Sequence, residues 1–208
     1  MSIRCFWLEP TQREAQALRR YANASCQAVP GGCHDARTPI GTAPAIRNEK
    51  GFHIEVPRAT WPPRADLLWP TRCACGYEFK ASDAWQLFSE LLYVRTDTRE
   101  EHTLRSAPPG AMWDAWWYRE GGHKGGYLGA GPGPDGRCLM VKTPGGEWYV
   151  DGRASNCTMP NDDVHRCWVR RGEVPNITVD KAGDTCGAGG GSIQAGSYHG
   201  FLTNGELT

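Results

Sequence analysis

The sequence lacks any apolar run of the roughly 18 residues that a transmembrane helix requires, so we expect none. The first residues, Met1 to Trp7, include no extended apolar stretch, and we therefore expect no signal peptide and a reducing cytoplasm as the compartment. The formal net charge at pH 7 is zero, because 23 Lys and Arg balance 23 Asp and Glu. This balance argues against a nucleic-acid-binding protein that relies on bulk electrostatics, although Arg166, Arg170 and Arg171 could form a local basic patch.

The common catalytic motifs are missing as well. We find no His-Glu-x-x-His, no Gly-x-Ser-x-Gly and no Walker lysine loop. The glycine-rich run Gly187–Ser192 lacks the Gly-Lys-Ser/Thr ending of a phosphate-binding loop, so turn formation explains it better. No enzyme class is indicated by these patterns.

Cysteine, by contrast, is abundant, with nine residues in 208. The most informative pair is Cys73-Ala74-Cys75-Gly76. Two thiolates one residue apart are poor disulfide partners but good metal ligands, because both sulfurs can point at one tetrahedral centre. The sequence therefore predicts a metal site, and zinc is the expected ion.

A Cys-x-Cys pair needs further ligands, and three sets of residues offer them. The first set is Cys186 with His199. The second is Cys26, Cys33 and His34, with Cys5 as an addition; it could form a separate metal site or supply ligands to Cys73 and Cys75. The third is Cys157, His165 and Cys167. Spacing alone does not choose among these sets.

The apolar pattern predicts an α+β fold. Thr11 and Glu14 can form a capping box, which predicts a helix from residue 11 to about residue 24. A second helix is expected from Ser82, and a third over 109–119. Short strands are expected at 3–8, 51–57, 138–142, 147–151, 167–170, 177–179 and 198–202, the later ones forming a small antiparallel sheet near the C-terminus.

We expect residues 1–208 to form a single compact, loop-rich domain. The glycine-rich segment 121–136 is the one place where a sub-boundary is expected. Trp113, Trp116 and Trp117 fall at helical spacing and are candidates for a core cluster or an interface.

Several sequence blocks resemble an uncharacterised protein family associated with actinobacterial viruses (phages) and actinobacterial genomes. The blocks are 73–79 (CACGYEF), 110–113 (GAMW), 151–158 (DGRASNCT), 165–168 (HRCW) and 198–202 (YHGFL). Residues 70–208 also resemble a wider group of small domains of unknown function that are proposed to bind zinc. This resemblance implies that Cys73 and Cys75 share one zinc with Cys186 and His199, and it implies a phage origin.

These observations lead us to expect a non-enzymatic, zinc-stabilised phage protein that acts through protein–protein contacts. The expected role is that of a virion-associated structural or accessory component of a capsid or tail. Its partners would be other phage structural proteins or a host protein, in the virion or the host cytoplasm. One alternative is a zinc-dependent enzyme or host-directed effector that binds a small molecule near His199. Another is a nucleic-acid-binding module that uses Arg166, Arg170 and Arg171.

Overall fold

The computed structural model describes residues 2–26, 28–49, 51–52, 54, 58–120, 132–133, 135–152, 169–180 and 192–208. Within these ranges the chain is mostly β-structure, and its longest helix, α1 (Trp117–Glu120), has four residues. The predicted α+β fold with N-terminal and central helices is therefore wrong. No helix in the described ranges is long and apolar enough to cross a membrane.

The strands differ greatly in length. They are β1 (Ile3–Arg4), β2 (Phe6–Cys26), β3 (Val29–Pro44), β4 (Ala84–Arg95), β5 (Glu101–Thr103), β6 (Ala111–Asp114), β7 (Leu139–Thr143), β8 (Gly146–Tyr149), β9 (Val169–Arg171), β10 (Thr178–Asp180), β11 (Ile193–Ala195), β12 (Tyr198–Gly200), β13 (Leu202–Thr203) and β14 (Glu206–Leu207). Two short 3-10 helices, η1 (Arg58–Thr60) and η2 (Val150–Gly152), complete the elements.

The chain divides into two compact units. Unit 1 comprises Met1–Glu9 and Tyr93–Thr208, and unit 2 comprises Pro10–Leu92. The division falls inside β2 and β4, the two strands that belong partly to each unit. The segment 121–136, where a sub-boundary is expected, lies mostly outside the described residues.

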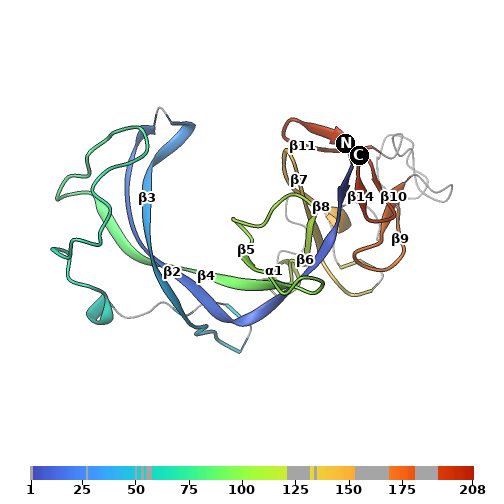
Figure 1. Ribbon diagram of the computed structural model, residues 1–208, viewed down its shortest axis with the longest axis horizontal. Coiled ribbons are helices and arrows are strands. Elements are labelled where there is room, and N and C mark those ends of the chain that lie inside the picture. Colours follow the sequence, from blue (N-terminus) through green and yellow to red (C-terminus); the bar gives the residue numbers. More distant parts are fainter. Residues whose placement is uncertain are drawn as a thin grey trace. The chain divides into compact units, whose positions relative to one another are not determined.

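Unit 1 is built from several small sheets around one apolar core. Antiparallel β6, β7 and β8 follow one another, and β6 also pairs in parallel with the start of β2. The N-terminal strand β1 pairs with the C-terminal strand β14, so the two chain ends lie side by side (Figure 1). One buried cluster of this unit comprises Cys5, Met112, Leu139, Val141, Val150, Ile177, Val179, Ile193, Leu202 and Leu207.

Unit 2 is dominated by the long antiparallel hairpin of β2 and β3, with β4 on the other side of β2 (Figure 1). The side chains of Glu14, Leu18, Ala22 and Cys26, four residues apart along β2, are buried. A second cluster comes from the connector between β3 and β4, where the buried rings of Trp61 and Trp69 each pack edge-on against Trp85.

The helix predicted over residues 11–24 is a strand because its signals fit both structures. Burial recurs every four residues in β2, a spacing that returns to the same face of a helix and of a strand. Glu14 does not cap a helix; it is buried and forms a 2.8 Å ion pair with Arg47. The Thr11 hydroxyl donates to the Leu92 carbonyl at 2.8 Å, so pairing with β4 replaces the predicted cap.

The other two predicted helices are also wrong. Asp83 stabilises a turn before β4, because its carboxylate accepts hydrogen bonds from the Lys80 amide and the Tyr77 hydroxyl. Trp85 and Phe88 are three residues apart, and side chains at an odd spacing point to opposite faces of a strand. Trp85 accordingly packs against Trp69, whereas Phe88 lies under the guanidinium of Arg37. Residues 111–114 form strand β6, which pairs with β7, and only α1 follows it.

The short strands near the C-terminus are confirmed within one or two residues at β7, β8, β9, β10 and β12. A tight turn at Asn204-Gly205 joins β13 to β14, with positive φ angles of 47° and 71°. Such a pair of left-handed residues matches the twist of a two-residue hairpin. The strand expected at 51–57 lies partly outside the described residues, and its described residues are not in a strand.

Candidate metal centre

Four candidate metal ligands converge in unit 2. The ligand atoms of Cys26, His34, Cys73 and Cys75 all lie within 4.8 Å of one another. Three of the side chains are buried, and Cys75 is half-buried. The arrangement can hold a metal ion.

The hairpin supplies two of these ligands. Cys26 is the last residue of β2, and His34 lies on β3 opposite Ala22 in the strand register. Ala22 and Cys26 both have buried side chains, and the register of β2 against β3 shifts between them. The pairing of the two strands therefore brings Cys26 and His34 close together near the end of the hairpin.

A tight turn supplies the other two ligands. Cys73 donates its amide to the Tyr77 carbonyl and accepts the Gly76 amide at its own carbonyl, each at 2.9 Å. Gly76 has a φ of 91°, a conformation that side chains strongly disfavour. These bonds close the knuckle turn, residues 71–79, and direct both sulfurs to one side.

The ligand atoms make close mutual contacts. The Sγ atoms of Cys26 and Cys73 are 3.7 Å apart, and Cys75 Sγ lies 3.2 Å from His34 Nδ1. Zinc–sulfur bonds of about 2.3 Å in a tetrahedron separate two sulfurs by about 3.8 Å. The cysteine pair thus already has the spacing of ligands on one tetrahedral ion.

Neighbouring groups orient and activate these ligands. The imidazole of His34 stacks on the Tyr77 ring with centroids 4.0 Å apart and an interplanar angle of 6°. The backbone amide of Cys75, helped by hydrogen bonds from His34 and Cys26, outweighs burial and lowers the pKa of Cys73 to about 6. A thiol with such a pKa is mostly thiolate at neutral pH, which is the form that binds metal.

The remaining sequence candidates lie elsewhere. Cys33 follows the strand alternation away from His34; it is exposed, with its sulfur 3.7 Å from Asn23 Oδ1. Cys5 lies in the core of unit 1, where burial raises its pKa to about 12 and keeps it a thiol. His199 is an exposed residue of β12 in unit 1, and its Nε2 lies 3.0 Å from Ser192 Oγ.

Cys186, the fourth ligand implied by the resemblance, lies outside the described residues, as do Cys157, His165 and Cys167. The set Cys73, Cys75, Cys186 and His199 therefore stays a prediction. The structure brings Cys73 and Cys75 together with Cys26 and His34, the alternative that the sequence left open. The pairing of β2 with β3 places His34 near Cys26, and the spacing of residues along the sequence does not reveal this pairing.

The tryptophans of the candidate interface differ in exposure. Trp113 is fully buried in β6 and packs in unit 1. Trp116 and Trp117 are half-buried and meet edge-on at 5.8 Å. Tyr118 follows them and stacks on Tyr149 at 4.9 Å.

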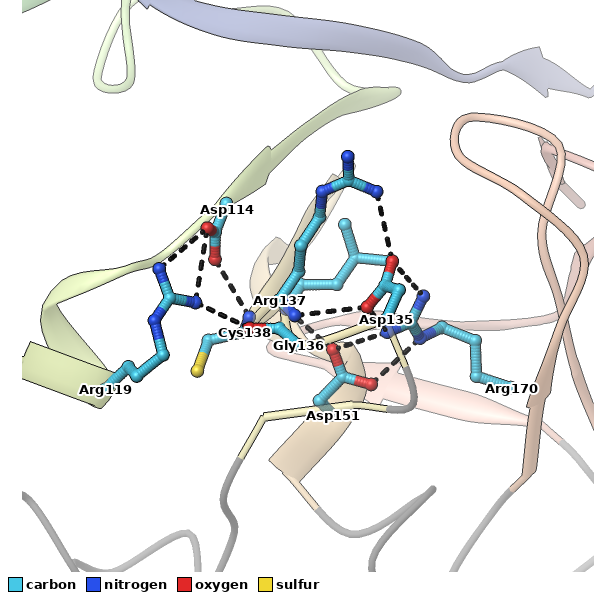
Figure 2. Close-up of polar contacts among 9 residues, drawn as sticks. Asp114, Arg119, Asp135, Gly136, Arg137, Cys138, Asp151 and Arg170 are labelled. Carbon is cyan, nitrogen blue, oxygen red and sulfur yellow. Dashed lines mark hydrogen bonds and ion pairs between the residues drawn. The ribbon is translucent and has the colours of Figure 1, made fainter.

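A second polar cluster, in unit 1, was not predicted (Figure 2). The guanidinium of Arg170 donates to both oxygens of Asp151 at 2.9 and 3.1 Å and to both oxygens of Asp135 at 2.7 and 3.2 Å. Asp151 is fully buried and also accepts the Leu139 amide at 2.7 Å. Because Arg170 is bound to two carboxylates, it is not a free cation for a nucleic-acid phosphate.

Comparison with known proteins gives no further assignment. No family model, curated protein or solved structure matches this chain.

Proposed function

We propose that the chain is a non-catalytic, zinc-stabilised β-protein that acts through protein–protein contacts. The observation that carries the proposal is the convergence of four protein ligands, Cys26, His34, Cys73 and Cys75, within 4.8 Å. A structural zinc has four protein ligands, whereas a catalytic zinc keeps one position open for water or substrate. Four side chains of this kind fill a tetrahedral zinc and leave no such position.

The ligand types select zinc over harder cations. Three sulfurs and one imidazole nitrogen suit zinc, whereas calcium and magnesium prefer oxygen ligands. The zinc would tie the end of the β2–β3 hairpin to the knuckle turn. The cluster of Cys26, Cys73 and Phe79 around it is small, so the ion would supply much of the local stability.

The virion-associated role rests on the resemblance to a phage protein family. It fits a chain with balanced charge and a metal site that lacks an open position. A component of a phage particle must be retained when particles are purified. Detection of the chain in purified particles, by mass spectrometry, is the expected result; its absence from particles that carry the gene would contradict this part of the proposal.

The zinc site predicts a metal content that can be measured directly. Protein purified without added metal should contain about one zinc per chain by elemental mass spectrometry. The Cys75→Ser variant should lose most of this zinc and melt at a lower temperature, because one of four ligands is gone. Cys33→Ser is the matched control, since Cys33 neighbours His34 but points away, and it should keep the metal. A folded wild type without metal, or equal metal loss in both variants, would contradict the site.

A further inference from the structure

The same cluster holds two sulfurs in a position to react with one another. Cys26 Sγ and Cys73 Sγ are 3.7 Å apart, and neither cysteine is in a disulfide. They lie 47 residues apart in the sequence, one at the end of β2 and the other in the knuckle turn. A disulfide has a sulfur–sulfur bond of about 2.05 Å, so the two sulfurs must approach by about 1.7 Å.

We propose that Cys26 and Cys73 form a reversible disulfide under oxidising conditions. This bond would replace the metal as the link between the hairpin end and the knuckle turn. The role of this disulfide rests on the proposed zinc site, but its formation requires only the two cysteines. The hairpin end and the knuckle turn would then stay tied in both conditions, by zinc in a reducing cytoplasm and by a covalent bond outside it. A phage component passes between these two environments.

The chemistry balances with a peroxide as the oxidant. One thiolate attacks a peroxide oxygen, which gives a sulfenic acid and releases hydroxide. The other thiol then displaces hydroxide from the sulfenic sulfur, the disulfide forms, and the protons and hydroxides combine. In total, two thiols and one hydrogen peroxide give one disulfide and two water molecules, and the two cysteine sulfurs are oxidised.

Disulfide formation would also release the metal. A disulfide sulfur carries no negative charge and is a poor zinc ligand, so only His34 and Cys75 would remain. Two ligands do not hold a structural zinc. The alternative bond between Cys73 and Cys75 is disfavoured, because cysteines one residue apart rarely reach disulfide geometry.

The experiment oxidises the full chain with hydrogen peroxide, once with zinc bound and once after chelation under reducing conditions. The intact mass of the chelated sample should fall by about 2 Da, the mass of two hydrogens. Trypsin should release residues 21–37 and 73–80 as one linked peptide that separates on reduction. In the zinc-loaded sample, a chromogenic chelator should record zinc release in step with this peptide.

Because each of these peptides contains two cysteines, single variants assign the bond. The linked peptide should persist in Cys33→Ser and in Cys75→Ser, and it should disappear in Cys26→Ser and in Cys73→Ser. The wild-type digest alone tests the proposal if a variant fails to fold. No linked peptide in oxidised, chelated wild type, or a bond assigned to Cys33, would overturn the inference.

The outcomes separate this inference from the proposed function. A chain that never binds zinc but forms the bond would contradict the zinc site and support the disulfide. A chain that binds zinc and yields only sulfinic acids after oxidation would support the zinc site and overturn the disulfide.

Discussion

Asp135 and Asp151 share a single guanidinium, that of Arg170, in the interior of unit 1. The side chains of Arg170 and Asp151 are 2% and 0% exposed, whereas that of Asp135 is 32% exposed. Removing one partner of such a buried set leaves an uncompensated charge, which costs far more than loss of a surface pair. The cluster therefore contributes to the stability of unit 1.

The stability of unit 1 should therefore depend on pH in the acid range. Burial alone would raise the pKa of Asp135, but hydrogen bonds from Arg170 and the Arg137 amide lower it to about 2 from its ordinary value of 3.8. A carboxyl with a lowered folded-state pKa contributes stability above its unfolded pKa, and this stability is lost as the pH falls toward about 2. Asp135→Asn should destabilise the protein by about 1–2 kcal/mol at pH 7 and by almost nothing near pH 2, after allowance for solvent screening.

Urea unfolding at several pH values would check this expectation. The control is Glu78→Gln, which removes an ion pair with Arg72 whose side chains are 67% and 69% exposed, and which should change little. A destabilisation by Asp135→Asn that is the same at pH 7 and pH 2 would show that the charge of Asp135 is not the cause.

Among the elements, the β13–β14 hairpin shows how a turn fixes the packing around it. The Gly205 amide donates to the Ile177 carbonyl at 2.8 Å, and its own carbonyl accepts the Cys5 amide at 2.7 Å. The turn therefore joins segments from both ends of the chain. A Cβ at Gly205 would lie 2.6 Å from the Pro175 carbonyl oxygen, which is closer than real Cβ atoms come to other atoms.

Replacing Gly205 with alanine should therefore lower the free energy of unfolding by more than the positive φ angle alone explains. The positive φ of 71° alone costs about 1–2 kcal/mol for a residue with a side chain, and the clash adds to it. We expect Gly205→Ala to lower the free energy of unfolding by about 3 kcal/mol. Gly136→Ala is the matched control, because its φ is 76° and a Cβ at this position would meet nothing within 4 Å.

The control variant should lose only about 1–2 kcal/mol. Chemical denaturation of both variants supplies the comparison. Equal losses would mean that the turn at Gly205 moves to accept the side chain.

For the whole molecule, the division into two units implies two sources of stability. Among the described residues, unit 1 has a large apolar core, whereas the buried cluster at the metal site of unit 2 consists of Phe79 and the two ligands Cys26 and Cys73. Apparent binding energies of structural zinc, about 10–16 kcal/mol, equal or exceed the stability of a typical domain. A zinc ion would therefore matter far more to unit 2 than to unit 1.

Metal removal should therefore destabilise unit 2 and leave the stability of unit 1 unchanged. When a chelator is added to the reduced protein, hydrogen exchange should accelerate in the β2–β3 hairpin and in residues 71–79. Amides of β7 and β14 should keep their protection, because none of the four converging ligands belongs to the core on which these strands pack. Loss of protection throughout the chain would contradict separate sources of stability, and no change at residues 71–79 would contradict a stabilising metal.

The sequence determined the features that depend on neighbouring residues. Cys73-Ala74-Cys75-Gly76 predicted a turn with two sulfurs, because a glycine follows two closely spaced cysteines. Asn204-Gly205 is a dipeptide that favours a tight turn, because both residues tolerate positive φ. The short strands near the C-terminus followed from alternating apolar residues bounded by turn residues.

Only the tertiary structure decided what residues far apart in the chain do together. The pattern of Glu14, Leu18 and Ala22 fits a helix and a strand equally, and the long-range pairing of β2 with β3 and β4 settles it. The same pairing decides that Cys26 and His34 join Cys73 and Cys75. Strand pairing is non-local, so its energy comes from partners that a local sequence window does not contain.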